Sequence, residues 1–282
     1  MKRVVVTGGS GFLGHYVVEH FVECGYDVLS VDANAPKKPL PARHLTANLE
    51  NLGECYGALT GAYAVIHLAS IPVAYSHPNE VTFRNNVMAS YNILEAAAGL
   101  GIMKVVIASS ESSYGICFAK KRIEPLYVPI DEEHPQIPED PYGLSKVVVE
   151  KTAESFHRRT GMQVVSMRIG NVITAEKYKE FPSFIHDSKQ RTVIVWSYID
   201  ARDVSCACRL AIETDGLGAV TVNIAADDTS MDIKSADLIK AEFPHVPIRG
   251  NIDGYKTLLS NEKAKKILGW QPVHHWRDNV AL

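Results

Sequence analysis

A tyrosine and a lysine four residues apart are the side chains of this sequence best suited to exchange a proton with an alcohol. Tyr142 and Lys146 lie in the run Pro141 to Lys146, which predicts the first turns of a helix, and side chains at i and i+4 share one helix face. An ammonium group beside a phenol favours the phenolate, and a phenol must lose about 3 pKa units to act as a base near neutral pH. The same spacing also fits the exposed start of a helix that carries an incidental pair.

Two serines follow the apolar run at residues 105–108, which predicts a buried strand. Side chains at the carboxyl end of a parallel strand face the ligand cleft of an α/β sheet. We therefore expect Ser110 to hydrogen-bond the reacting oxygen, whereas Ser109 better fits a strand-end cap.

A glycine-rich turn near the N-terminus predicts a dinucleotide site. The run Thr7 to Gly14 follows the β-branched residues 4–6, and such a strand-turn-helix junction directs free N–H groups at a pyrophosphate. Asp32 ends the next predicted strand about 20 residues further on, where a carboxylate accepts a hydrogen bond from a ribose 2′-hydroxyl. This arrangement favours NAD over NADP, although Lys37 and Lys38 could accommodate a 2′-phosphate.

Short β-branched runs alternate with helix-like segments along the chain, which is typical of a doubly wound parallel sheet. The predicted strands cover residues 4–6, 28–31, 65–68, 105–108, 164–167 and 220–224, and the predicted helices cover 15–24, 86–100 and 145–159. The pattern predicts an α/β, Rossmann-type fold with a dinucleotide-binding domain over residues 1–170, completed by a strand at about 219–225. Residues 171–282 are predicted to form mostly a smaller C-terminal substrate lobe.

The composition narrows the class of function. The net charge is −3 and no long cluster of Lys and Arg occurs, which argues against nucleic-acid binding. No apolar stretch has the length of a signal peptide or a membrane span, so we expect a cytoplasmic protein without membrane contact. The five cysteines lack the paired spacing of a metal site, so no metal is expected.

Motifs spread over nearly the whole chain resemble the extended short-chain dehydrogenase/reductases of the NAD-dependent epimerase/dehydratase family. The motifs are Thr7 to Gly14, Ile66 to Ser70, Asn86-Val87, Ser109-Ser110, Tyr142 to Lys146, Arg168 to Val172, Tyr198 to Val204 and Lys263 to Trp270. The resemblance implies NAD as cofactor and a carbohydrate-like small molecule as substrate. It also implies a possible homodimer formed by the helices at 86–100 and 145–159.

The resemblance assigns roles to individual residues. Tyr142 would be the general base, Lys146 would hold the nicotinamide ribose and lower the tyrosine pKa, and Ser110 would polarise the substrate oxygen. The implied cofactor contacts are Gly8, Gly11, Phe12, Leu13, Gly14, Asp32, Asn48, Leu49, Leu68, Ala69, Ser70, Asn86 and Ile169, together with Tyr142 and Lys146. The candidate substrate contacts are Ser70, Glu111, Ser112 and Asn171. Arg168 and Trp270 are interpreted as structural residues.

Two departures from the family pattern bear on the reaction. Glu111 and Ser112 stand where dehydratases of the family carry aspartate and glutamate, and the loss of one carboxylate disfavours elimination of water. Only a short bridge joins Asn171 to Tyr198, in a region where enzymes acting on nucleotide sugars usually clamp the nucleotide. The short segment between Asn171 and Tyr198 resembles that of uronate dehydrogenases of the same superfamily.

The expected function is therefore an NAD-dependent oxidoreductase that transfers hydride to or from a secondary alcohol of a sugar or sugar acid. An NAD-retaining nucleotide-sugar epimerase remains the alternative, and a non-catalytic NAD(P)-sensing protein is a weaker one, since it would not need the Tyr142-Lys146 pair. Four cations are candidates for binding a substrate carboxylate, although each also fits an ordinary solvated charge: Lys177, His186, Arg191 and Arg202.

Overall fold

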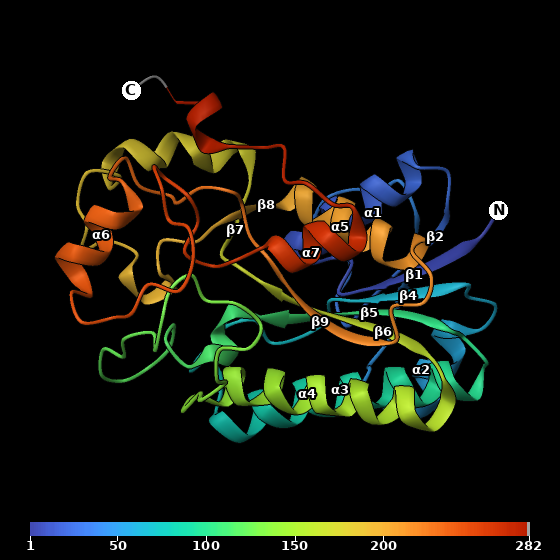
Figure 1. The fold of residues 1–282 in the computed structure, drawn as a ribbon. Coiled ribbons are helices and arrows are strands. Elements are labelled where there is room, and N and C mark those ends of the chain that lie inside the picture. Colours follow the sequence, from blue (N-terminus) through green and yellow to red (C-terminus); the bar gives the residue numbers. More distant parts are fainter. Residues whose placement is uncertain (281–282) are drawn as a thin grey trace.

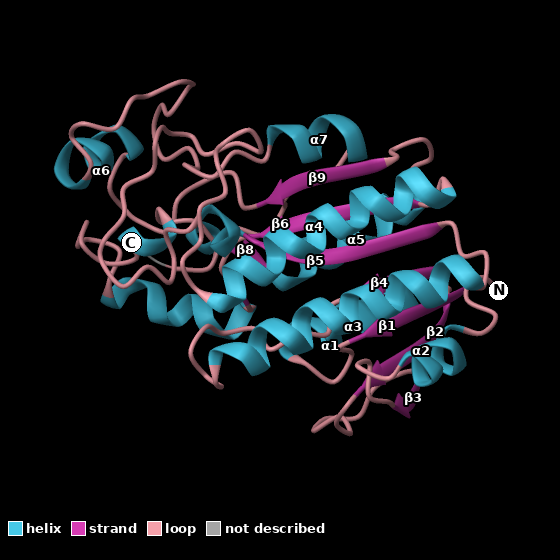
Figure 2. Ribbon diagram, turned by 90° about the horizontal axis from the view of Figure 1, so that it is seen from below, coloured by secondary structure: helices cyan, strands magenta, loops and turns pink. Residues whose placement is uncertain are grey.

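The structure is a computed structural model that describes residues 1–280. Its centre is a seven-stranded parallel sheet in the order β3-β2-β1-β4-β5-β6-β9 (Figures 1 and 2). The strands are β1 (Arg3–Thr7), β2 (Asp27–Asp32), β3 (Arg43–Thr46), β4 (Ala64–His67), β5 (Lys104–Ser110), β6 (Gln163–Ile169) and β9 (Ala219–Ile224). The predicted α/β fold is thus confirmed. The strand order reverses between β1 and β4, and such a switch point creates a crevice at the carboxyl ends of the strands.

Helices cover both faces of the sheet, which explains why its strands are nearly continuous apolar runs. In Figure 1, α1 (Phe12–Glu23), α5 (Ala201–Glu213) and α7 (Glu262–Leu268) lie above the sheet, and α2 (Leu52–Leu59), α3 (Asn79–Gly99) and α4 (Pro141–Thr160) lie below it. Each face has its own cluster of buried apolar side chains. The sheet is therefore a rigid platform for whatever binds at its edge.

Helix α4 has well-defined ends. The Asp140 carboxylate accepts a hydrogen bond from the Gly143 N–H at 2.7 Å, and Pro141 occupies a first-turn position where no N–H is needed. The helix ends at Gly161, whose φ of 75° suits a residue without a side chain. The Asp140 cap fixes the first turn of α4, which carries Tyr142.

The remaining elements form a lobe against the carboxyl ends of the strands (Figure 1). They comprise the paired strands β7 (Val172–Ile173) and β8 (Ile199–Asp200), helix α6 (Ser235–Glu242), and the 3-10 helices η1 (Glu111–Tyr114), η2 (Ala175–Ser183), η3 (Thr192–Ile194) and η4 (Trp276–Asp278). The lobe has apolar clusters of its own, around Trp196 and Phe181. The C-terminal part of the chain supplies β9 to the sheet, and it also supplies α5 and α7 to the layer above it.

The predicted elements match their structural counterparts in position, with differences at the ends and edges. Helix α3 begins at Asn79 rather than at residue 86, and β3, β7 and β8 have no predicted counterpart. Strand β3 is a four-residue edge strand whose side chains are mostly exposed, so it lacks the apolar pattern of a buried strand.

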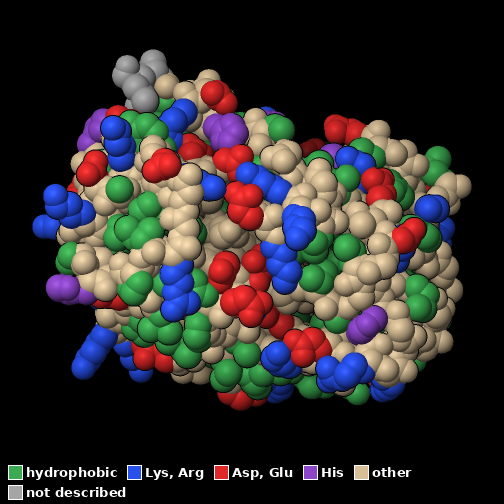
Figure 3. Space-filling view, in the orientation of Figure 1, with side chains coloured by type: hydrophobic (Ala, Val, Ile, Leu, Met, Phe, Trp, Pro, Cys, Tyr) green, Lys and Arg blue, Asp and Glu red, His purple; other side chains and the backbone are tan. Residues whose placement is uncertain are grey.

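Two further observations concern partners. Within residues 1–280, no helix is long and apolar enough to cross a membrane, and no group of three or more His, Cys, Asp and Glu side chains is arranged to hold a metal ion. On the face shown in Figure 3, acidic and basic side chains are interspersed rather than gathered into a basic surface.

Candidate active site

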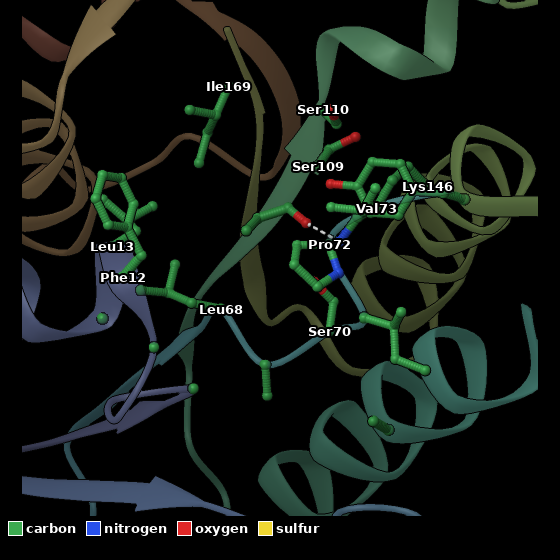
Figure 4. Close-up of a pocket in the computed structure, with 18 of the residues that line it drawn as sticks. Phe12, Leu13, Leu68, Ser70, Pro72, Val73, Ser109, Ser110, Lys146 and Ile169 are labelled. Atoms are coloured by element: carbon green, nitrogen blue, oxygen red, sulfur yellow. Dashed lines mark hydrogen bonds between the residues drawn. The ribbon is translucent and has the colours of Figure 1, made fainter. Parts of the chain in front are cut away.

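A cavity of about 690 Å³ opens at the carboxyl ends of the sheet strands, within the size range of small-molecule sites. Figure 4 shows Ser109, Ser110 and Lys146 on one side of it. Phe12, Leu13 and Leu68 lie on the opposite side. All the residues to which the resemblance assigns catalytic, cofactor or substrate contacts line this cavity, with the exception of Asn86, whereas the four candidate cations do not line it.

The glycine turn after β1 is built without room for side chains. The Gly8 N–H donates to Val31 O at 2.7 Å, and a Cβ on Gly8 would lie only 2.7 Å from the Ala69 nitrogen. A Cβ on Gly14 would lie 2.0 Å from the Gly8 carbonyl oxygen. The first turn of α1 carries neither an acidic residue nor a side-chain cap, so its N–H groups stay available to an anion. This turn fits the pyrophosphate of a dinucleotide.

Asp32 is held in place at the end of β2. Its carboxylate accepts hydrogen bonds from the backbone N–H of Ser10 at 3.2 Å and of Asn34 at 3.1 Å. Nearby, Asn48 uses its side-chain oxygen to accept from the Glu50 N–H at 3.0 Å. The Asp32 carboxylate is thus oriented by the backbone at the place where the sequence predicts a ribose contact.

Replacing Asp32 with alanine is expected to weaken NAD binding by about 10-fold, because a hydrogen bond to a charged group contributes about 1.5 kcal/mol or more. NADP should lose much less, since the carboxylate repels a 2′-phosphate. Calorimetric titration of each dinucleotide measures the two dissociation constants. Equal losses for both would show that Asp32 does not distinguish the 2′ position.

The three predicted catalytic side chains meet at one end of the cavity. The Lys146 Nζ donates to the Ala108 carbonyl oxygen at 2.8 Å and lies 5.3 Å from the centroid of the Tyr142 ring (Figure 4). The Ser110 hydroxyl donates to Ser112 Oγ at 3.0 Å and lies beside the Tyr142 side chain, whose pKa it lowers. The ring of Phe118 packs edge-on against Tyr142 with 5.9 Å between centroids, which shields the phenol from water.

Burial moves the pKa values of this pair in opposite directions. It raises the pKa of Tyr142 to about 12, against a lowering hydrogen bond from Ser110, and it lowers the pKa of Lys146 to about 8. Burial is the largest influence on both groups, so the expected lowering of the Tyr142 pKa by Lys146 stays a prediction. Both charged forms lose hydration, while the Lys146 Nζ donates to Ala108 O.

The side chain of Asn86, predicted to lie beside the cofactor, does not line the cavity. Its side chain is buried behind the loop after β4, where Oδ1 accepts from the Ile71 N–H at 2.7 Å and Nδ2 donates to the Ile71 carbonyl oxygen and to Ser145 Oγ. The preceding residue, Asn85, lines the cavity instead. Asn86 therefore joins the cavity loop to helix α4 and acts on the site through the backbone of that loop.

The two serines at the end of β5 have different surroundings. The Ser109 hydroxyl donates to Glu150 Oε1 at 2.5 Å, and Glu150 forms a buried ion pair with Arg168. Ser109 and Arg168 are thus part of a buried structural network that joins β5 and β6 to α4 through Glu150.

Trp270, the other residue interpreted as structural, is fully buried and donates from its indole to the Asp203 carbonyl oxygen at 3.0 Å.

Glu111 is embedded in the wall of the cavity rather than solvated. Its Oε2 accepts from the Ser197 hydroxyl at 2.5 Å, and Arg191 lies nearby, donating to Asn171 Oδ1 at 3.0 Å. Burial raises the pKa of Glu111 to about 7, while Ser197 and Arg191 act in the opposite direction. Arg191 is half-buried and hydrogen-bonded, so its interpretation as a solvated charge is also wrong.

The raised pKa of Glu111 makes the folded state bind a proton more tightly than the unfolded chain. This contribution to stability is present below the ordinary value of 4.5 and is lost as the pH rises through about 7. Glu111→Gln removes that dependence, so its stability relative to wild type should rise by about 2 kcal/mol between about pH 5 and about pH 8. Urea unfolding at the two pH values measures the difference, and a difference that stays constant would contradict the assignment.

Several cavity residues have no counterpart among the predicted ones. They are Ala33, Asn34, Ala47, Glu50, Ile71, Pro72, Val73, Asn85, Ala89, Ala108, Cys117, Phe118, Gly170, Val172 and Ile194, alongside Ser109. Most lie in irregular loops, which have no hydrophobic period to reveal which side chains face a ligand.

Comparison with known proteins agrees with this geometry. The family model described as NAD dependent epimerase/dehydratase matches residues 4–225. UDP-glucose 4-epimerase of Corynebacterium glutamicum is 25% identical over 309 aligned positions, covering 96% of this chain and 91% of that protein. Uronate dehydrogenase of Pseudomonas putida is 27% identical over 234 positions, covering 82% and 78% respectively.

A solved structure shares the fold. The short-chain dehydrogenase/reductase superfamily protein from Agrobacterium tumefaciens, determined with bound NAD, superposes with a TM-score of 0.76. It is 23% identical, and the match covers 98% of this chain and 94% of that chain.

Proposed function

Given that this chain belongs to the NAD dependent epimerase/dehydratase family, and is thus an NAD-dependent enzyme of the extended short-chain dehydrogenase/reductase type, we propose that it transfers hydride between NAD and a secondary alcohol of a sugar or sugar acid. One observation carries the proposal. Ser110, Tyr142 and Lys146 line the same cavity as the glycine turn, so the proton-transfer groups and the cofactor site open into one space.

Ser110, Tyr142 and Lys146 have different roles in the proposed oxidation of an alcohol. Ser110 donates or accepts a hydrogen bond at the reacting oxygen, and Tyr142 takes the hydroxyl proton. When bound, NAD would supply the hydride acceptor and a positively charged ring that favours the phenolate, and the glycine turn and Asp32 would hold it. Lys146, held by Ala108 O at the base of the tyrosine, contributes positive charge at the same end of the cavity. The reverse sequence reduces a ketone.

An epimerase would use the same three residues and return the hydride to the opposite face of the sugar. The similarity to UDP-glucose 4-epimerases supports this alternative, whereas the short bridge between Asn171 and Tyr198 and the similarity to uronate dehydrogenase support net dehydrogenation. Purified protein with NAD and a panel of sugars, sugar acids and nucleotide sugars separates the two. Steady accumulation of NADH absorbance supports a dehydrogenase, and a new stereoisomer without NADH supports an epimerase.

We also propose a homodimer in which α3 and α4 meet their copies. The two helices lie side by side on the outside of the sheet (Figure 2), and Met88, Tyr91 and Leu144 on them are exposed by 40%, 42% and 45%. Tyr91→Lys should convert a dimer into a monomer on size-exclusion chromatography with light scattering. Leu126→Lys, which changes an exposed leucine outside these helices, should leave the mass unchanged. A monomeric wild type would refute the proposal.

A further inference from the structure

The part of the cavity beyond Ser110 contains one acidic group, Glu111. The residue lies in the first turn of η1, directly after the catalytic strand, and forms part of the cavity wall with Ser112 and Asn171. Its Oε2 accepts from the Ser197 hydroxyl at 2.5 Å. The carboxylate is therefore anchored from the lobe side and remains at the surface that a substrate would touch.

Arg191, the cation whose charge acts on Glu111, is already hydrogen-bonded to other groups. Its Nε donates to Ser230 Oγ at 2.8 Å, and its Nη2 donates to Asn171 Oδ1 at 3.0 Å and to the Ser197 carbonyl oxygen at 2.9 Å. Its charge also faces Glu111. Arg191 thus stabilises the lobe segment around it.

That segment is conformationally constrained. Arg191, Val195 and Trp196 have φ values of 61°, 49° and 55°, a region that is unfavourable for residues with side chains and most of all for a β-branched valine. Ile194 between them lines the cavity. The hydrogen bonds of Arg191 and Glu111 hold this strained segment against the site, so the guanidinium is not free to swing toward an anionic ligand.

The other candidate cations are also committed or remote from the cavity wall. Among the described residues that line the cavity, Lys146 is the only basic one, and its Nζ donates to Ala108 O. Arg202 is bonded through Nε and Nη2 to the two carboxylate oxygens of Asp200. Lys177 and His186 are exposed side chains that do not line the cavity.

We propose that Glu111 selects the substrate by charge, so that the site takes a neutral polyhydroxylated compound, an aldose or polyol, and rejects compounds with a carboxylate or phosphate at that end. This inference rests on the proposed hydride transfer and narrows its substrate class. Hydroxyl groups donate to a carboxylate, and the amide of Asn171 and hydroxyl of Ser112 add neutral partners. An anion placed there faces a like charge in a partly desolvated pocket.

Matched substrates test the selection. Glucose, glucuronate and glucose 6-phosphate, and likewise galactose and galacturonate, differ only at the carbon remote from the anomeric centre. With wild type and NAD at about pH 8, where Glu111 is mostly ionised, the neutral member of each set should have a kcat/KM at least about 10-fold above its anionic partners. Glu111→Gln should reduce that ratio by about 10-fold, because the repulsion is removed and the Arg191 charge is no longer opposed.

Two control variants isolate the effect of charge at this position. Glu111→Asp keeps the charge and should retain the preference for neutral sugars. Glu180→Gln removes an exposed carboxylate of the same lobe and should not alter the ratio. Thermal unfolding establishes that each variant is folded.

The outcomes separate this inference from the proposed function. NADH formed from anionic sugars as fast as from neutral ones, or an unchanged ratio in Glu111→Gln, overturns the charge selection and leaves hydride transfer standing. If no sugar yields NADH, the proposal of hydride transfer is refuted. Calorimetric measurement of how the same sugars bind to the complex with NAD then tests the charge selection by itself. Tighter binding of neutral sugars supports it, and tighter binding of anions, or no binding at all, overturns it.

Discussion

Turnover falls by about 100-fold or more when Tyr142 is replaced with phenylalanine, while the dissociation constant of NAD stays nearly the same. This is the expected result because the phenol oxygen is the only atom lost, and a positioned acid or base contributes about 100- to 10,000-fold to rate. Lys146 keeps its hydrogen bond to Ala108 O, and the glycine turn lies at the other end of the cavity. Single-turnover kinetics and calorimetry measure the two quantities separately.

A matched variant controls for the loss of a hydroxyl group. Tyr26 precedes β2, at the end of the sheet opposite the cavity, and donates to Glu213 Oε1 at 2.8 Å. Tyr26→Phe should therefore change stability slightly and leave turnover unchanged. Unchanged turnover in Tyr142→Phe would remove the phenol from the mechanism, and a large loss of NAD affinity would assign Tyr142 mainly to cofactor binding.

The dinucleotide half of the site is predictable from sequence because it depends on local backbone geometry. Gly8, Gly14 and Asp32 belong to one strand-helix-strand unit, and their spacing reports how closely the chain approaches itself and a ligand. The buried strands can also be predicted from the sequence, since a strand covered on both faces must be apolar throughout. The structure places all three residues on the cavity wall.

The substrate half is harder to predict because its contacts join distant segments. Glu111 and Ser197 are 86 residues apart, and Arg191 and Ser230 are 39 apart, yet each pair is hydrogen-bonded. No periodicity or spacing rule connects such positions. The sequence therefore names Glu111 only as a candidate substrate contact, without its partners, and leaves Arg191 with an ordinary surface interpretation.

Burial also affects the predicted chemistry of the Tyr142-Lys146 pair. The spacing of Tyr142 and Lys146 indicates that they are neighbours, but it does not show how far each is removed from water. Because both are buried, loss of hydration is the largest cause of the shift in each pKa in the protein alone. We therefore expect the pKa of the Tyr142 phenol to fall to the value needed for catalysis only when NAD is bound.

Replacing Gly14 with alanine is expected to weaken NAD binding by about 100-fold. The added Cβ would lie 2.0 Å from the Gly8 carbonyl oxygen and 2.7 Å from the Gly9 Cα, and both are backbone atoms that cannot rotate away. The turn must open, which misplaces the N–H groups at the start of α1. Losing two hydrogen bonds to a charged pyrophosphate, at about 1.5 kcal/mol each, corresponds to that factor.

Gly57→Ala is the control for the same chemical change. Gly57 lies exposed within α2, where an added Cβ meets no atom within 4 Å, so alanine should stabilise the helix by about 1 kcal/mol and leave NAD affinity unchanged. Calorimetry gives the affinities and thermal unfolding the stabilities. Wild-type affinity in a folded Gly14→Ala protein would mean that the dinucleotide does not rest on this turn, and the hydride-transfer proposal would then lose its cofactor site.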